Sequence, residues 1–495
     1  MSNARPNIVL IMSDQHRKDA LGCQGNPHAI TPNLDRIANQ GVVFENFYSN
    51  APLCLPARMS FLTGQHPSQH RCWSNHDALS SQISTFAHSL GIAGYETVLS
   101  GRMHIVGPDQ LHGFQQRPIA DFRGTWLWGG WKLKPVLGDL VDTPGMQRAG
   151  IEKSGPGRSG YMEYDEMIRD VTANWIRDRG EREGEDRPFC LVSGFIAPHC
   201  PFVCPRDHFE RHYENMTLPD VPEGCLEDLH PVQRAMRRKS NIEDLSREEI
   251  LRTRAAYYGL VEWFDGLVGD VLAELETQGM LDDTVVIYTS DHGDQLGDHG
   301  MWWKSTFYES SVGVPFLISW PGHLRRGQRI SENASLMDIG PTLIDLADAP
   351  ELPNAKGRSF RTLLEEDGAD WADEVYAEML DGHGPRRMVR SGEWKLNAYY
   401  GQRPELYNLE DDPDEFHNRA DDAGCASVVR RLEERIFAGW DPEEVLSDAA
   451  VNRRERELLG RWVRAVEPHD PYGWPGPDGE KPENYVEDVS SGGSG

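Results

Sequence analysis

Short apolar runs that stop abruptly at polar residues recur along the chain and predict buried strands ending at one edge of a sheet. The first run is Pro6–Met12, and the polar residues 13–17 follow it directly. The same pattern recurs at 97–99, 189–195 and 284–288. Because ligands bind beyond the carboxyl ends of parallel strands, these four segments predict a mostly parallel sheet with a single site on one edge.

Between these strands, apolar residues recur at the spacing of a helix turn. A helix is expected at Pro32–Gln40, with Thr31 as its N-cap and a proline in the first turn, where a missing N–H costs nothing. Further elements are expected at 247–278 and 337–346 (helices) and at 42–48 (a strand). Stretches rich in Pro, Gly and charge, at about 145–160 and 205–245, predict long surface connections.

The pattern of apolar and polar residues changes near Trp371, where short β-like runs replace the alternation of strands and helices. These runs lie at 375–379, 387–389 and 394–396, and a helical pattern follows at 426–438. We therefore expect a large α/β domain over 1–370 and a smaller C-terminal α+β subdomain with a small antiparallel sheet over 371–467.

The last segment, 468–495, is rich in Pro and Gly and has no periodicity. Such a composition is typical of a disordered tail or of an arm that wraps a neighbouring subunit. On this ground we expect a homo-oligomer, either a dimer or a tetramer.

The composition favours an ordinary globular protein and excludes some partners. The 495-residue chain is 38% hydrophobic and 26% charged, which allows a large core. Its 50 Lys and Arg against 79 Asp and Glu give a formal charge of −29. Such a surface repels nucleic-acid phosphates and anionic lipid headgroups, so neither nucleic acid nor a membrane is expected as a partner. A small anionic substrate would need a local group of cations.

No segment predicts export or membrane insertion. The longest apolar run near the start, Ile8–Met12, is too short for a signal peptide, and no run approaches the ~20 apolar residues of a membrane span. The eight dispersed cysteines are expected to be reduced thiols, and we expect a cytoplasmic protein. Cys200 and Cys204 lie near histidines but lack a second thiolate pair, so zinc is not expected.

The sharpest local signal is a cysteine at the predicted start of a helix. Cys54 is followed by Pro56, which suits a first helical turn, and by Arg58, one turn further on. A helix N-terminus and a guanidinium create a positive field that suits an anionic ligand. From chemistry alone, this is an activated nucleophile or an oxyanion site, and the alternative is a buried structural cysteine before an ordinary helix.

Two stretches resemble known signatures. Cys54-x-Pro56-x-Arg58 with Leu-Thr-Gly at 62–64, and G-Y-x-T-x-x-x-G-R-x-H at 94–104, are similar to the two signatures of the type I sulfatases of the alkaline-phosphatase-like superfamily. The resemblance spans roughly residues 5–440 and is greatest to choline sulfatases, then to phosphonate monoester hydrolases. It implies an α/β fold with a large, mostly parallel sheet sandwiched by helices. It also implies that a formylglycine-generating enzyme converts Cys54 to Cα-formylglycine.

The resemblance further implies one divalent metal at the strand ends. Its ligands would be Asp14, Gln15, Asp291 and His292, together with residue 54. Many sulfatases use Asp-Asp and Asp-Asn at these places, whereas Asp-Gln with Asp-His resembles choline sulfatases and phosphonate monoester hydrolases. Ca²⁺ is the first expectation for these hard ligands, with Mn²⁺ and Mg²⁺ as alternatives.

Five side chains are expected to act on the substrate. Arg58, Arg102 and Lys304 are candidates to stabilise the charge that grows as the ester bond breaks. The family usually has Lys at position 102, where Arg keeps the charge but is larger. His104 would help to deprotonate the formylglycine hydroxyl, and His199 would act as general acid or hydrogen-bond donor to the leaving group.

Candidates for substrate binding follow the signatures. Asn75 is expected to reach the sulfate. Trp126, Trp128 and Trp131 form a dense aromatic group, which predicts either a cation–π box for a quaternary ammonium or a packed loop core.

The expected activity is hydrolysis of a small sulfate monoester, such as choline sulfate or an aryl or alkyl sulfate. The alternative on the same scaffold is hydrolysis of phosphonate monoesters or phosphodiesters, because both transfers need similar positioning and charge. A third hypothesis is an inactive anion-binding homologue in which Cys54 stays a thiol.

Overall fold

The central layer of the protein is an eight-stranded sheet with strand order β11-β2-β10-β9-β1-β7-β4-β5. In that order the strands are Gln328–Ile330, Val42–Phe44, Phe316–Ser319, Thr284–Ser290, Asn7–Asp14, Phe189–Pro198, Glu96–Gly101 and Gln116–Ile119. The computed structural model describes residues 5–122, 125–126, 146–182, 184, 187–366, 368–469 and 485–486.

All strands of this sheet run in one direction except β10, which is antiparallel to both neighbours, β9 and β2. The central strand β1 pairs in parallel with β7 and β9, and β7 pairs in parallel with β4. The carboxyl ends of these four strands therefore lie at the same edge, as the sequence pattern predicted.

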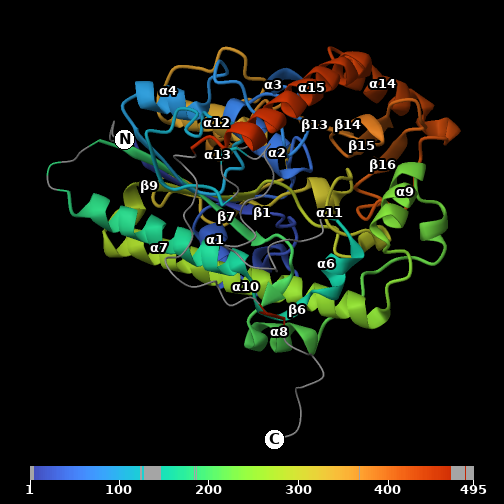
Figure 1. Ribbon diagram of the computed structural model, residues 1–495, viewed down its shortest axis with the longest axis horizontal. Helices are drawn as coiled ribbons and strands as arrows, with labels where there is room; N and C mark the ends of the chain where they lie inside the picture. Colours follow the sequence, from blue (N-terminus) through green and yellow to red (C-terminus); the bar gives the residue numbers. More distant parts are fainter. Residues whose placement is uncertain are drawn as a thin grey trace, which may run out of the picture.

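Helices cover both faces of the sheet, which confirms the expected α/β sandwich (Figure 1). On one face lie α1 (Pro32–Gln40), α7 (Gly160–Gly180) and α10 (Arg247–Thr277); on the other lie α2 (Cys54–Thr63), α4 (Phe86–Ile92) and α12 (Leu336–Leu346). Alternate residues of β1 enter the two hydrophobic cores: Val9 and Ile11 face the first group of helices, whereas Ile8, Leu10 and Met12 face the second. Both faces are thus buried, as in other parallel sheets.

A second sheet forms the C-terminal part and lies to the right in Figure 1. It is an antiparallel meander of four strands, which are β13 (Glu374–Asp381), β14 (Gly384–Ser391), β15 (Trp394–Tyr399) and β16 (Glu405–Asn408). Two helices accompany it, α14 (Ala426–Phe437) and α15 (Pro442–Val466). The strands and α14 match the expected α+β subdomain, whereas α15 was not predicted.

The two expected surface connections were wrong, because each contains regular elements. These are α6 (Arg148–Glu152), β6 (Gly155–Arg158), α8 (Arg206–Tyr213) and α9 (Pro231–Ser240). In α9, half of the residues are buried, but only Val232 and Met236 among them are large and apolar. The segment is therefore polar in composition, which is why its sequence resembles a surface connection.

The expected strand at 42–48 is divided into two. It forms β2 and then β3 (Phe47–Tyr48), which leaves the central sheet and pairs with β12 (Ala334–Ser335). A third small sheet joins β6 to β8 (Val203–Cys204) and β17 (Tyr485–Val486).

The remaining short helices are η1 (Gly22–Gln24), α3 (Pro67–His70), η3 (Cys225–Glu227), η4 (Leu281–Asp283), η5 (Asp298–Gly300), α11 (Glu309–Val312), α13 (Arg361–Glu365) and η6 (Ala423–Cys425). Within the described part of the chain, no helix is both long and apolar enough to cross a bilayer.

Candidate active site

Cys54 is the first residue of α2, a buried helix whose N-terminus points at the carboxyl edge of the sheet. The unpaired N–H groups of a first helical turn favour negative charge nearby. Its Sγ lies 3.1 Å from Lys304 Nζ, 3.2 Å from His292 Nε2 and 3.6 Å from Asp14 Oδ1. Residue 54 therefore sits where a helix start and two strand ends meet.

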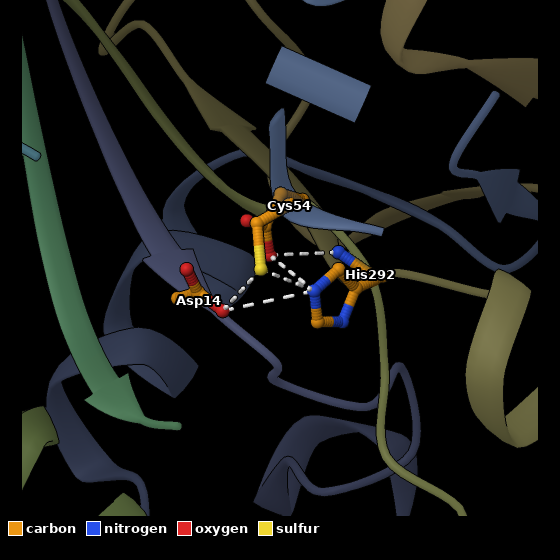
Figure 2. Close-up of side chains that lie close together, drawn as sticks. Asp14, Cys54 and His292 are labelled. Atoms are coloured by element: carbon orange, nitrogen blue, oxygen red, sulfur yellow. Dashed lines mark hydrogen bonds and ion pairs between the residues drawn. The ribbon is translucent and has the colours of Figure 1, made fainter. Parts of the chain in front are cut away.

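Four buried side chains converge at this point and offer ligand atoms to a metal. They are Asp14, Cys54, Asp291 and His292, and their ligand atoms all lie within 4.8 Å of one another. Figure 2 shows Asp14, Cys54 and His292 pointing toward one another. Two carboxylates and an imidazole nitrogen beside residue 54 form a donor set that fits a divalent cation, and these are four of the five residues predicted as ligands.

Gln15 lies beside this group in a left-handed backbone conformation (φ 70°). Its backbone N–H donates to Asp291 Oδ1 (3.1 Å), and its side-chain Oε1 accepts from Lys304 Nζ (2.8 Å). Its Nε2 donates to Asp294 Oδ2 (2.5 Å). The predicted role of Gln15 as a ligand stays a prediction.

Asp294 is a residue that sequence reasoning did not assign. It is buried, holds the Gln15 amide and accepts from the backbone of Leu296 (2.8 Å) and Trp303 (3.2 Å). Burial is the main cause that raises the pKa of Asp294, to about 6. Its place three residues after Asp291, in a polar turn following a strand, was the only available signal.

Arg58 is fully buried and contacts the candidate metal ligands on their outer side. Its Nε donates to Asp291 Oδ2 (2.8 Å), and its Nη2 donates to Asp14 Oδ2 (3.3 Å). Two more of its N–H groups donate to backbone carbonyls. Arg58 thus orients both carboxylates, so its geometry supports a positioning role more directly than the predicted contact with the substrate.

Arg102 also binds Asp14 but keeps a free donor. Its Nε donates to Asp14 Oδ2 (2.7 Å), and its side chain is only 1% exposed. Its Nη1 has no hydrogen-bond partner among the described residues. A buried N–H without an acceptor is rare in native proteins, so this nitrogen is available for an anionic ligand.

The two predicted catalytic histidines both contact residue 54. Hydrogen bonds from His104 and His199 to the Cys54 side chain help to lower the pKa of its thiol. The backbone N–H of His104 donates to Asp121 Oδ2 (2.9 Å). His199 Nδ1 lies 2.6 Å from the Cys200 carbonyl oxygen, and burial lowers the pKa of His199 to about 4.

The electrostatics of the site favour an anion at position 54. Burial alone raises the pKa of the Cys54 thiol, but Lys304 and His292 outweigh it, and the pKa lies well below its ordinary value. Burial likewise raises the pKa of Asp14, whereas Arg102 and Lys304 hold it well below its usual range. The same field would stabilise an oxyanion on a modified residue 54.

The structure describes only some of the predicted substrate-binding residues. Asn75 Oδ1 accepts from the backbone N–H of Leu55 (3.0 Å), next to residue 54. Trp126 Nε1 donates to the His469 carbonyl (3.1 Å), and its ring lies 5.5 Å from that of Trp462 on α15. This packing favours the loop-core interpretation for Trp126. Trp128 and Trp131 lie outside the described residues.

Comparisons with known proteins agree with the geometry. Residues 6–349 match the Sulfatase family, and residues 297–439 match the C-terminal region of N-sulphoglucosamine sulphohydrolase. A choline-sulfatase of Rhizobium meliloti (strain 1021) is 34% identical over 481 residues, covering 94% of this chain and 91% of the relative. An arylsulfatase of Clostridium perfringens is 31% identical over 441 residues, covering 84% of this chain and 90% of the relative.

Among solved structures, a phosphonate monoester hydrolase of Agrobacterium radiobacter superposes with a TM-score of 0.71 and 25% identity, covering 90% of this chain and 96% of that one. The family match extends over more than half of the chain, and it includes the segments that carry all four converging side chains, Cys54 among them. The chain therefore belongs to the sulfatase family and is a sulfuric ester hydrolase.

Proposed function

We propose that the protein hydrolyses a small sulfate monoester through a formylglycine formed from Cys54, with choline sulfate as the first candidate and aryl or alkyl sulfates next. The observation that carries the proposal is the place of the Cys54 side chain, within 3.6 Å of Asp14, His292 and Lys304. The 34% identity to a choline-sulfatase supports choline as the alcohol.

The maturation step converts a thiol into an aldehyde. A formylglycine-generating enzyme, with molecular oxygen as the oxidant, would oxidise the Cys54 CH₂–SH by two electrons to CH=O, and the sulfur would leave as sulfide. Water then adds to the aldehyde and gives a hydrate with two hydroxyl groups on one carbon. Such a group is a stronger oxygen nucleophile than a serine when a neighbouring cation lowers its pKa.

The metal would be held by Asp14, Asp291, His292 and residue 54, with Gln15 beside them. When bound, a divalent cation, with Ca²⁺ as the first expectation and Mn²⁺ or Mg²⁺ as alternatives, lowers the pKa of the attacking hydroxyl and balances the charge of the sulfate. Arg58 holds the outer oxygens of both carboxylates, so their orientation does not depend on the substrate.

The proposed reaction has two steps at residue 54, a displacement at sulfur and an elimination that reforms the aldehyde. One hydroxyl loses its proton to solvent and attacks sulfur, the bond from sulfur to the alcohol oxygen breaks, and His199 supplies a proton or a hydrogen bond to that oxygen. His104 then takes a proton from the second hydroxyl, the bond from carbon to the sulfated oxygen breaks, and sulfate leaves as the aldehyde reforms. Lys304 and the free Nη1 of Arg102 offer cationic donors to the sulfate oxygens throughout.

Hydrolysis of phosphonate monoesters or phosphodiesters is the second candidate. The Agrobacterium radiobacter phosphonate monoester hydrolase, with 25% identity over 90% of this chain, favours it, and so does the Asp-Gln and Asp-His pattern of the site. Parallel kcat/KM measurements on choline sulfate, an aryl sulfate and an aryl phosphonate monoester separate the two. The first proposal requires the highest value on a sulfate.

Intact-mass spectrometry tests the nucleophile and the third hypothesis, an inactive anion-binding homologue. Protein from a host with the maturation enzyme is expected to be lighter than the encoded chain by about 18 Da, the difference between a thiol side chain and an aldehyde. An unmodified mass, together with the absence of turnover on all three esters, would contradict the proposal and favour the inactive homologue.

A further inference from the structure

Lys304 lies between two residues whose backbone adopts an unusual conformation. Trp303 has φ 64° and Ser305 has φ 76°, and both are non-glycine residues in the left-handed region. Such conformations persist only where the surroundings hold them, and they gather at functional sites. The contacts on either side of Lys304 therefore decide where its ammonium group lies.

On the N-terminal side, these contacts come from the same loop. The Trp303 N–H donates to Asp294 Oδ1 (3.2 Å), and the Trp303 carbonyl accepts from the Gln295 N–H (2.8 Å). This side of Lys304 is thus held by the turn that also carries the metal ligands.

On the C-terminal side, the contacts come from distant parts of the chain. The Ser305 N–H donates to the Pro52 carbonyl (3.2 Å), two residues before Cys54. The Ser305 carbonyl accepts from Arg386 Nη1 (3.3 Å), which belongs to β14 of the C-terminal sheet. A guanidinium of the C-terminal subdomain therefore holds the peptide that follows Lys304.

The two faces of β14 contact different parts of the protein. On the face of Arg386, Met388 packs against Phe307 and Val312, so this face lies on the segment that follows Lys304. On the opposite face, Arg387 Nη1 donates to the Ile436 carbonyl of α14 (2.6 Å). Because side chains alternate along a strand, neighbouring arginines serve the active-site segment and the subdomain interior respectively.

Burying Arg386 is costly unless its charge has partners. Its side chain is 2% exposed, and its one ion pair among the described residues is with Asp381, which is 31% exposed at the end of β13. An apolar side chain of similar volume would cover the same surface without that cost. Besides the pair with the partly exposed Asp381, what only the guanidinium supplies is the hydrogen bond to Ser305.

We infer that Arg386 is a positioning residue for catalysis, which keeps Lys304 Nζ against residue 54 and Gln15 by holding the Ser305 peptide. The inference rests on the proposed role of Lys304 in sulfate-ester hydrolysis. It assigns to the C-terminal subdomain a part in the active site, although none of its side chains is among the predicted catalytic or metal-binding residues.

The test compares Arg386→Met with Arg387→Met, its matched neighbour. Both variants remove a buried guanidinium from β14 that donates to a backbone carbonyl, so both are expected to lower the midpoint of thermal unfolding. Only Arg386→Met is expected to lower kcat, by about tenfold to a hundredfold, because small displacements of a catalytic group have effects of this size. Metal content, measured by elemental analysis, should match the wild type in both.

A double-mutant cycle with Lys304→Met tests whether Arg386 affects kcat through Lys304. In the Lys304→Met background, adding Arg386→Met is expected to cause no further loss of kcat, because the residue that it positions is already absent. Equal losses of kcat in Arg386→Met and Arg387→Met, or additive losses in the double variant, would overturn the inference.

A second variant keeps the test usable if Arg386→Met does not fold. Arg386→Lys retains the charge and is expected to show an intermediate loss of kcat with a normal unfolding midpoint; an unchanged kcat would count against the inference. Failure of the proposed function is recognised separately, since the wild type would then hydrolyse none of the sulfate esters.

Discussion

Two buried groups of charged side chains lie on either side of the segment 304–309. They differ in how far the cations of the protein itself neutralise the carboxylates. In the group between the catalytic domain and the C-terminal sheet, Lys395 Nζ lies 2.8 Å from Glu309 Oε1 and 2.6 Å from Glu415 Oε1. Glu309 is also paired with Lys18 and accepts from Tyr48 Oη (2.9 Å). Each carboxylate there has an ammonium partner, so the group is closed.

In the active site, the guanidiniums bind only one oxygen of each carboxylate, and Lys304 Nζ lies 3.9 Å from the other oxygen of Asp14. Arg58 donates to Oδ2 of both Asp14 and Asp291, and Arg102 donates to Oδ2 of Asp14. The Oδ1 atoms lie 3.7 Å and 3.6 Å from His292 Nε2, on the side of Cys54. Burial of charge is thus common to both groups, and what distinguishes the binding site is that the guanidiniums leave one side of each carboxylate turned inward.

The largest effect is expected from Cys54→Ala. Removal of the nucleophile should lower kcat/KM by about 10⁴-fold or more, because the remaining groups cannot form the covalent intermediate. The control is Cys190→Ala, a buried cysteine in the core of β7, which should keep its activity. Steady-state kinetics on an aryl sulfate measures both, and substantial turnover by Cys54→Ala would refute the assignment.

Removal of the metal is expected to affect the active-site group and not the group around Lys395. A chelator is expected to lower kcat by about 10³-fold or more, because the charge of the sulfate would lose its main counter-charge. Thermal unfolding should also shift downward, since a ligand that binds only the folded state stabilises it. Restoration by Ca²⁺, Mn²⁺ and Mg²⁺ in turn ranks the metals, and full activity in metal-free protein would exclude a metal-dependent mechanism.

The closed group is expected to affect stability rather than chemistry. Lys395→Met leaves Glu309 and Glu415 without their shared partner, so the free energy of unfolding should fall by about 3–5 kcal/mol. At temperatures where the variant is folded, kcat should stay close to the wild-type value. The control is Arg361→Met, whose exposed pairs should contribute less than about 1 kcal/mol. Denaturant titration compares the two variants, and equal losses would contradict the view that the closed group is a stabilising element.

The smallest effect concerns the leaving group. His199→Ala should lower kcat/KM by about 10²-fold for an alkyl sulfate and much less for an aryl sulfate, because only the poorer leaving group needs a proton. A series of esters with leaving groups of increasing pKa measures the difference as a slope. A uniform loss across the series would show that His199 does not act as general acid.

Much of the fold was predictable because the relevant signals are local. The strand at Asn7–Asp14 and the helix at Pro32–Gln40 follow from runs of neighbouring residues, a proline in the first turn and a change from apolar to polar. The charged helix α9 was not predictable in this way, because most of its buried residues are polar or charged and become core positions only where the folded chain covers them. The division of 42–48 into β2 and β3 likewise depends on pairing partners almost 300 residues away.

In the candidate site, too, some residues were predictable from the sequence and others were not. The candidate ligands and the candidate nucleophile were predicted from short motifs at strand and helix ends, and the folded chain brings four of these residues together. Asp294 and Arg386 were not, since a buried carboxylate in a turn and an arginine in a strand have many ordinary roles. Their contacts with Gln15 and with Ser305 exist only in the folded chain.

The sequence by itself determined many of the elements, the family and the chemical types of the side chains at the carboxyl edge of the sheet, because these depend on local periodicity and on short motifs. Only the tertiary structure decided which oxygen of each carboxylate Arg58 binds, which donor of Arg102 stays free, and how Arg386 holds the segment of Lys304. The physical reason is that hydrogen bonds and charge interactions depend on distances of a few ångströms between residues such as Arg58 and Asp291, which are 233 positions apart in the chain.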